Sequence, residues 1–266
     1  MTTQPPATQN LPGTSAAQPG TSAAQPGTSA GQPGTTAPRP GTSAARHGTG
    51  DADLAIMLAA HAALRRDLVR LAHVTARADL HDPARHESIA AGWDLFKHEL
   101  HLHHTAEDDL IWPALRPRLV HSASAQSTLD AMEEEHTWID PLLAAVDEAF
   151  AAQPGTAADR LPDAVDALTS TLTGHLGHEE RDALPLIGVA LTASEWRRVG
   201  FRMSRRNGLS TTGEMFAWML DNPTPTITPG ATPTPGTPAT LRTLPPPFRL
   251  LYRARWKPRY EATPRW

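Results

Sequence analysis

The chain has 266 residues, carries a formal net charge of −4 and contains no cysteine. The lack of cysteine excludes disulfides, thiolate metal sites and iron–sulfur clusters, and it leaves nitrogen and oxygen atoms as metal ligands. No apolar run approaches the roughly 20 residues that a membrane-spanning helix needs. The first ten residues show no basic stretch followed by an apolar one, so no secretory signal is visible. We therefore expect a cytoplasmic protein.

Two segments are too rich in Pro, Gly and Thr to join a folded core. Residues 12–46 repeat a seven-residue unit that begins as PGTSAAQ, and residues 222–238 read NPTPTITPGATPTPGTP. The repeat offers no apolar stripe that a coiled coil would bury, and its prolines and glycines break helices. We expect four parts: a disordered tether over 1–50, a folded domain over 51–190, a short helical extension over 191–221, and a linker with a basic-aromatic tail over 222–266.

Charge is distributed unevenly along the chain. Residues 1–50 hold two arginines and no acid, whereas residues 224–266 hold six arginines and one lysine against one acid, which gives +2 and +6. Because the whole chain carries −4, residues 51–223 must carry −12. An acidic body argues against nucleic acid as a partner of the folded part and suits a site that collects cations.

Four amphipathic helices are predicted, and no segment has a convincing strand pattern. Apolar residues recur at helical spacing along four segments, over about residues 51–77, 83–113, 124–150 and 159–186. Four long helices with short connections predict an all-α fold, an up-down-up-down four-helix bundle. Thr192 and Glu195 have the spacing of a capping box, so a short fifth helix should follow the bundle, and another is expected over 214–220.

Two of the predicted helices carry a histidine and a glutamate one turn apart. The segment HHTAEDDLIWPAL contains His103 and Glu107, and HLGHEERDALPLI contains His175 and Glu179. The i, i+4 spacing places both members of each pair on one helix face. In both segments a second acid follows directly, and a proline stands six residues after the first acid.

The other two helices carry one histidine each on the apolar face, His61 and His136. The bundle thus divides into two hairpins with the same pattern, a His and then a His-x-x-x-Glu. Facing half-sites of this kind offer four imidazoles and two carboxylates, a set that suits a pair of iron or manganese ions bridged by the carboxylates. Buried charges without partners are costly, and a metal ion satisfies all of them together. The competing interpretation is a metal-free bundle whose histidines form hydrogen bonds in the core.

This pattern resembles the hemerythrin-like family, whose cation-binding domains carry His, His-x-x-x-Glu, His and His-x-x-x-Glu on four successive helices. The resemblance covers about residues 51–190. It implies a non-heme di-iron centre with six ligands, His61, His103, Glu107, His136, His175 and Glu179. It also implies binding or sensing of dioxygen, nitric oxide, peroxide or iron. The alternatives are a di-iron oxidoreductase that turns over peroxide and a metal-free helical interaction module.

Two positions leave the ligand set open. The oxygen carriers of this family place two histidines one turn apart on the third helix, whereas here Asp140 stands a turn beyond His136. Asp140 is then a seventh ligand or the partner of a histidine, and an extra carboxylate argues against reversible oxygen carriage. Glu180 has the spacing that the carriers use, but we favour Glu179 because it matches the internal repeat. Four histidines that flank the stripe are expected to face solvent or to support the ligands: His98, His101, His104 and His178.

Rival chemistries find less support. A ferritin-like enzyme needs two Glu-x-x-His motifs, and only Glu133 with His136 supplies one. No HExxH zinc motif and no G-x-S-x-G elbow is present. The last segment, PPPFRLLYRARWKPRYEATPRW, mixes arginines with aromatic residues, which suits an acidic membrane surface or nucleic acid. We favour a tail that packs back on the acidic bundle, or a solvated tail, because the preceding residues 51–223 carry a charge of −12.

Overall fold

The computed structural model describes residues 51–76, 82–152, 160–221 and 246–266. Within these ranges the regular structure is helical and contains no strand, which confirms the predicted all-α fold. No helix of the described ranges has both the length and the apolar content needed to cross a bilayer. The predicted tether over 1–50 and the Pro/Thr-rich linker lie outside the described residues.

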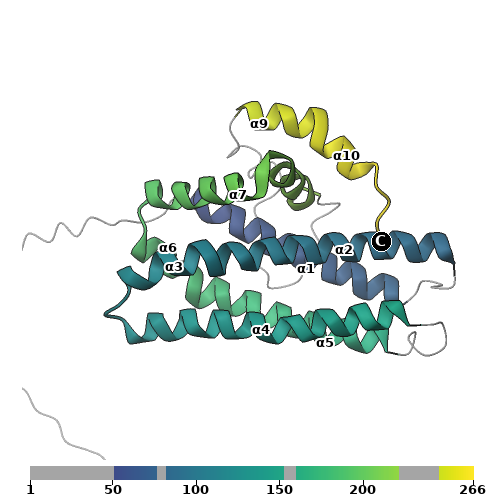
Figure 1. Ribbon diagram of the computed structural model, residues 1–266, viewed down its shortest axis with the longest axis horizontal. Helices are drawn as coiled ribbons and strands as arrows, with labels where there is room; N and C mark the ends of the chain where they lie inside the picture. The colour runs from purple at the N-terminus through teal and green to yellow at the C-terminus, as the bar shows by residue number, and fades with distance from the viewer. Residues whose placement is uncertain (1–50, 77–81, 153–159, 222–245) are drawn as a thin grey trace, which may run out of the picture. The chain divides into compact units, whose positions relative to one another are not determined.

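Four long helices form the bundle, namely α1 (Asp51–Thr75), α2 (Pro83–Ala106), α4 (Ala123–Ala151) and α5 (Leu161–His178). Each runs antiparallel to the next along the chain, and α1 and α4 both pack against α5 and α2 (Figure 1). The second helix continues through η1 (Glu107–Ile111), α3 (Trp112–Leu115) and η2 (Arg116–Arg118), and α5 continues through η3 (Glu179–Ala183) and α6 (Leu184–Ala190). The bundle follows the predicted up-down-up-down order.

Side-chain caps fix where the helices begin. The Asp82 carboxylate accepts the N–H of Ala84 at 3.1 Å, with proline in the first turn of α2. The Ser122 hydroxyl accepts the N–H of Ala125 at 3.3 Å at the start of α4. These side chains satisfy backbone donors that have no partner within the helix, which is why the helices start where the sequence pattern predicts.

The core divides into two apolar clusters along the bundle axis, with a polar layer between them. One cluster holds Leu64, Leu68, Phe96, Leu100, Ile139, Val146, Leu168 and Leu172 among its buried residues. The other holds Met57, Ile111, Trp112, Leu129, Met132, Leu184 and Ile187. On every bundle helix the predicted histidine lies close to the boundary between the residues of one cluster and those of the other. The apolar clusters therefore exclude water from the polar layer on both sides along the axis.

Two π-helical turns, η1 and η3, widen the bundle helices at this layer, and each begins at a predicted glutamate. The backbone N–H of Trp112 bonds to the carbonyl of Glu107, five residues back, and the N–H of Leu184 bonds to that of Glu179 in the same way. The cause is a proline one residue later in each case, because proline has no N–H and its ring clashes with the carbonyl four residues back. The prolines that the sequence places six residues after the acids thus produce the widened turns.

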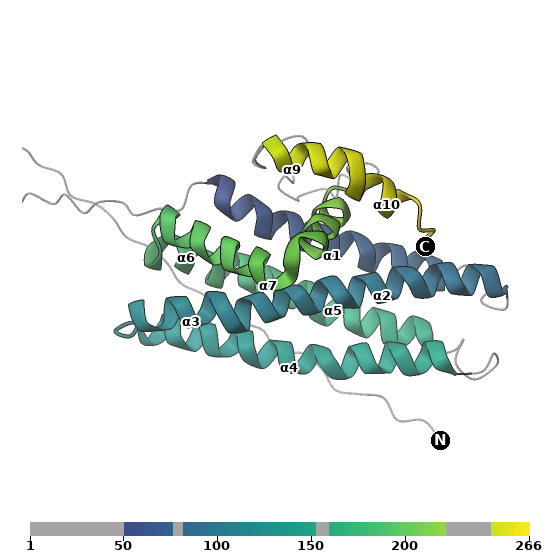
Figure 2. The same ribbon diagram turned by 45° about the horizontal axis from the view of Figure 1, so that its top comes forward.

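A long helix, α7 (Ala193–Met219), follows the bundle and crosses its outer face (Figure 2). Its predicted capping box is confirmed, since Thr192 and Glu195 each bond to the other's backbone. The helix is longer than the short segment predicted, and it bends at Gly208, where φ is 78°. A glycine tolerates this left-handed conformation, so two helical segments join there without a loop.

The C-terminal tail is helical and packs on the rest of the molecule. It consists of α9 (Pro246–Leu251), η4 (Tyr252–Trp256) and α10 (Lys257–Glu261). Tyr252 and Trp256 are buried with Ala217 and Leu220 of the α7 region. The Tyr260 hydroxyl donates to the Asp221 carboxylate at 3.1 Å. The aromatic side chains of the tail are therefore used mainly for internal packing.

Replacing Gly213 with alanine should displace the tail. An added Cβ would lie 1.9 Å from Cε2 of Trp256, whereas at Gly200, on the same helix, it would meet nothing within 4 Å. We expect Gly213→Ala to lower the free energy of unfolding by about 2 kcal/mol, the value of burying one large apolar side chain. Gly200→Ala should be neutral or stabilise by up to about 1 kcal/mol. Urea unfolding followed by tryptophan fluorescence measures both, and equal stability of the two variants would contradict the described packing.

Candidate metal centre

The polar layer contains seven side chains that form two adjoining clusters. The first cluster consists of His61, His103, Glu107 and Glu179, and the second of His104, His136 and His175. Within each cluster, the candidate ligand atoms lie within 4.8 Å of one another. All six residues predicted from the sequence are thus brought together, and one further histidine joins them.

The first cluster joins side chains from α1, α2 and the two π-helical turns. His61 Nε2 lies 3.0 Å from Glu179 Oε2, and His103 Nε2 lies 3.1 Å from Glu107 Oε1. His103 Nε2 also lies 4.0 Å from Glu179 Oε2. Two imidazoles and two carboxylates therefore face a common point, the donor set that a divalent iron or manganese ion accepts.

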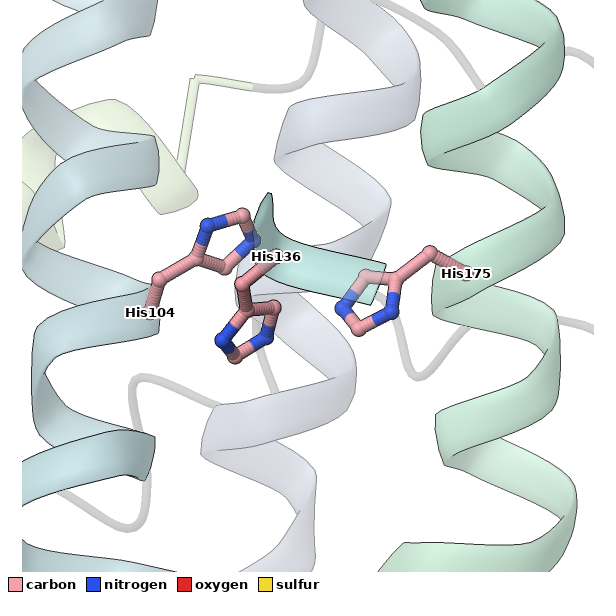
Figure 3. Close-up of side chains that lie close together, drawn as sticks. All are labelled: His104, His136 and His175. Atoms are coloured by element: carbon pink, nitrogen blue, oxygen red, sulfur yellow. The ribbon is translucent and has the colours of Figure 1, made fainter. Parts of the chain in front are cut away.

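The second cluster is made only of histidines, one each from α2, α4 and α5 (Figure 3). The rings of His104 and His136 stack, with centroids 4.0 Å apart, and that of His175 stands edge-on to both. The expectation that His104 faces solvent or supports another ligand is not what the geometry shows. A signal was present in the sequence: His104 lies one turn after the fully buried Leu100, so it continues the apolar stripe of α2.

Glu107 connects the two clusters. Its Oε1 atom faces His103 of the first cluster, and its Oε2 atom lies 3.4 Å from Nε2 of His136 in the second. The Glu107 side chain is fully buried. A carboxylate with one oxygen toward each of two ligand clusters has the orientation needed to bridge two metal ions.

The layer is not satisfied by its own hydrogen bonds. Nine side-chain atoms of these residues are buried without a hydrogen-bond partner: the Nε2 atoms of all five histidines and both oxygens of Glu107 and Glu179. Unpaired polar atoms are rare in protein interiors because each costs about 1–3 kcal/mol. Here they converge, and all are nitrogen or oxygen atoms that ligate iron-class metals. The residues therefore fit a bound metal cation.

Carboxylates on the far side of the imidazoles hold three of the rings in place. His61 Nδ1 lies 2.8 Å from Glu180, and His175 Nδ1 lies 2.8 Å from Glu135. His136 Nδ1 lies 3.0 Å from Asp108. An ionised carboxylate only accepts hydrogen bonds, so each Nδ1 donates and each Nε2 keeps its lone pair for a metal ion.

These contacts assign roles to the acids that the sequence left open. Glu179 lies in the first cluster, whereas Glu180 binds the far side of His61 and pairs with Arg65 at 2.6 Å. Asp140 is exposed on the outer side of α4 and belongs to neither cluster. The extra carboxylate that argued against oxygen carriage is therefore absent from the layer, and an extra imidazole from α2 is present in its place.

The remaining flanking histidines differ in their surroundings. His98 and His101 are exposed on α2. His178 Nδ1 lies 2.7 Å from Glu135, the carboxylate that also contacts His175, so it supports the second cluster from outside. Glu133, the acid of the single ferritin-like motif, pairs with Arg116 at 2.9 Å and takes no part in the layer.

The same contacts set the proton affinities of the metal-free layer. Burial acts to lower the pKa of His61, but the charge of Glu179 outweighs it and raises this pKa to about 9. Burial also acts to lower the pKa of His136. The hydrogen bond with Asp108 is the first of the effects that oppose burial, and together they raise this pKa to about 9. Burial, followed by the charge on His61, lowers the pKa of His103 to about 3. Without metal, the imidazoles of His61 and His136 are therefore positively charged at neutral pH.

Five imidazoles and two carboxylates on the inner faces of four antiparallel helices define a histidine–carboxylate metal-binding bundle. Residues 52–187, just over half of the chain, match the hemerythrin HHE cation binding domain. The chain belongs to this family, and its bundle is a cation-binding domain. Neither a search of curated proteins nor a search of solved structures returned a match.

Replacing His104 tests whether the second cluster is a ligand set. We expect His104→Ala to weaken metal binding at this cluster by more than tenfold, since even the loss of a ligand's supporting partner costs about 10–100-fold. His101→Ala, an exposed histidine on the same helix, is the matched control and should leave the metal content unchanged. Metal titrations of both variants measure this, and identical affinities would exclude His104 as a ligand.

Metal binding should release protons. His61 and His136, with pKa values raised to about 9, are largely protonated at pH 7 in the metal-free protein, and ligation requires their neutral forms. Affinity for manganese(II) should therefore rise between pH 7 and 9 by about tenfold per unit for each proton released. Calorimetric titrations at pH 7 in buffers of different ionisation enthalpy count the protons. Release of none would contradict charged histidines in the layer.

Proposed function

We propose that this protein binds two non-heme iron ions in the polar layer, with manganese as the alternative metal, and that the loaded centre binds or senses dioxygen, nitric oxide or peroxide in a sensing or protective role. The observation that carries the proposal is the convergence of nine unpaired buried atoms in two clusters that Glu107 connects. An iron pair supplies reversible one-electron chemistry and coordination positions for a small ligand. The residues of the chain hold the ions, orient the ligands and exclude water.

The ligands proposed are the six expected from the sequence together with His104. One half-site then consists of His61 and His103 with Glu107 and Glu179, and the other of three histidines with the second oxygen of Glu107. Nitrogen and oxygen donors of this kind suit iron and manganese, and the absence of thiolates disfavours softer metals. The chain's own contribution is to orient the imidazoles through the outer carboxylates and to exclude water with the apolar clusters.

A metal-free interaction module accounts for the buried carboxylates less well than a metal site does. Glu107 and Glu179 are fully buried, and burial followed by the charge of Glu179 raises the pKa of Glu107. In a metal-free role, the fold would keep two carboxylates buried within 4.8 Å of each other, at a cost in desolvation and repulsion. A bound cation removes both costs, and this favours the metal-binding function.

Removing one imidazole from each half-site tests the proposal. His103→Ala combined with His175→Ala should abolish stoichiometric metal binding and lower the melting temperature, because the two glutamates are then buried without a cation. The control is His98→Ala with His101→Ala, which also removes two imidazoles, both of them exposed on α2. Elemental analysis and thermal melts compare the two double variants. Full metal content and wild-type melting in the first variant would exclude the assigned ligands.

A further inference from the structure

A small cavity adjoins the first ligand cluster. It lies between α1, α2 and α7, has a volume of about 30 Å³, and has His103 in its wall. Four of the chain's six methionines line it, namely Met57, Met203, Met215 and Met219, together with Trp218. A single water needs about 10–15 Å³ by this kind of measure, so the cavity accommodates a molecule of about two heavy atoms. The seven candidate metal ligands do not account for this cavity.

Glu99 is the one acidic side chain in the cavity wall, and the metal centre does not use it. It stands one turn before His103 on α2, so both side chains lie on the same face of the helix. Glu99 is only 2% exposed, and its Oε2 atom is buried without a hydrogen-bond partner. A buried carboxyl group in apolar surroundings costs stability unless something binds to it.

Burial keeps this carboxyl group neutral. Burial first, and then the negative charges of Glu214 and Asp67, raise the pKa of Glu99 to about 8. At neutral pH the group is mostly a carboxylic acid, which has one O–H to donate. The cavity thus presents one carboxyl O–H donor in a wall that is otherwise made of thioethers, aliphatic groups, an indole and the imidazole of His103.

The outer wall of the cavity comes from α7, which lies beyond the residues that match the cation-binding domain. This wall is anchored to α1 by a buried hydrogen bond, in which Trp218 Nε1 donates to Asp67 at 2.7 Å. Arg66 adds a second link, since its guanidinium donates to the carbonyl of Trp218 at 3.0 Å. The extension after the bundle therefore closes the cavity as a fixed wall.

We infer that this cavity is a binding chamber for a neutral diatomic gas, dioxygen or nitric oxide, and that Glu99 donates a hydrogen bond to the bound molecule. The inference rests on the proposed function, because the chamber shares His103 with the proposed iron site. Apolar walls favour a gas over hydrogen peroxide, since peroxide brings two O–H donors that these walls leave unpaired. The chamber belongs to this chain's own architecture, because α7 supplies Trp218 and three of the four methionines in its wall.

Nitric oxide is the probe for the test, with the full-length, ferrous-loaded protein under anaerobic conditions. Glu99→Met removes the donor at nearly the same side-chain length, whereas Glu99→Gln keeps both the shape and a donor. Met203→Trp fills the chamber from α7, and Phe201→Trp, at an exposed position of the same helix, is its matched control. Iron content, by elemental analysis, shows in each variant whether the fold and the centre are intact.

We expect equal iron content in all variants, and a nitric oxide affinity about tenfold weaker in Glu99→Met and Met203→Trp, the effect of one lost hydrogen bond and lost volume. Glu99→Gln and Phe201→Trp should stay within about threefold of the wild type. Unchanged affinity in Glu99→Met with full iron content overturns the chamber and leaves the iron centre intact. A slower reaction with hydrogen peroxide and unchanged nitric oxide binding overturns the choice of a gas. A wild-type protein without iron overturns the proposed function itself.

Discussion

The fold is organised around two carboxylates that lie where water cannot reach them. Glu107 and Glu179 are fully buried between two apolar clusters, and neither has a hydrogen-bond partner for its oxygens. Such groups are tolerated only with a compensating cation. Five imidazoles converge on the same layer from four helices, so the layer is built to hold positive charge at its centre. A cation bound at this layer would therefore stabilise the folded bundle.

The layer is close to a twofold repeat, and its departures from symmetry are informative. Each hairpin lends an acid to the other: Asp108 of the first holds His136 of the second, and Glu180 of the second holds His61 of the first. These crossed contacts join the hairpins across the centre. The symmetry fails where His104 stands on α2, since the equivalent position on α5 is Leu176. The two clusters therefore differ in donor type, since one holds two imidazoles and two carboxylates and the other holds three imidazoles.

Much of this centre was accessible from the sequence because helical periodicity and ligand spacing are local. The spacing of His103 and Glu107 places both on one face whatever the tertiary structure, and the internal repeat identified Glu179 over Glu180. The role of His104 depended on the packing of α4 beside α2, and single-residue spacing does not encode which of two adjacent histidines turns inward. The prolines that follow the glutamates are visible in the sequence. Their effect, a widened turn at each glutamate, is seen only in the backbone structure.

The extension and tail show a second limit. The capping box at Thr192 marks the start of α7, whereas its last turns bury Trp218 and contain Gly213, over which the tail packs. Arginines and aromatics in the tail suggested an external acidic partner as readily as an internal one. The Trp256 ring packs closely against a glycine, so this ring is used for internal packing. Sequence periodicity does not predict such a contact.

The presence of two iron ions in the polar layer is tested by the metal content of anaerobically purified protein, measured by mass spectrometry, with an optical spectrum before and after exposure to air. The account predicts about two irons per chain, as in di-iron carboxylate bundles, with near-ultraviolet bands that appear in air. No stoichiometric metal, even after reconstitution with iron, would contradict it and would reduce the seven residues to polar groups of a helical interaction module.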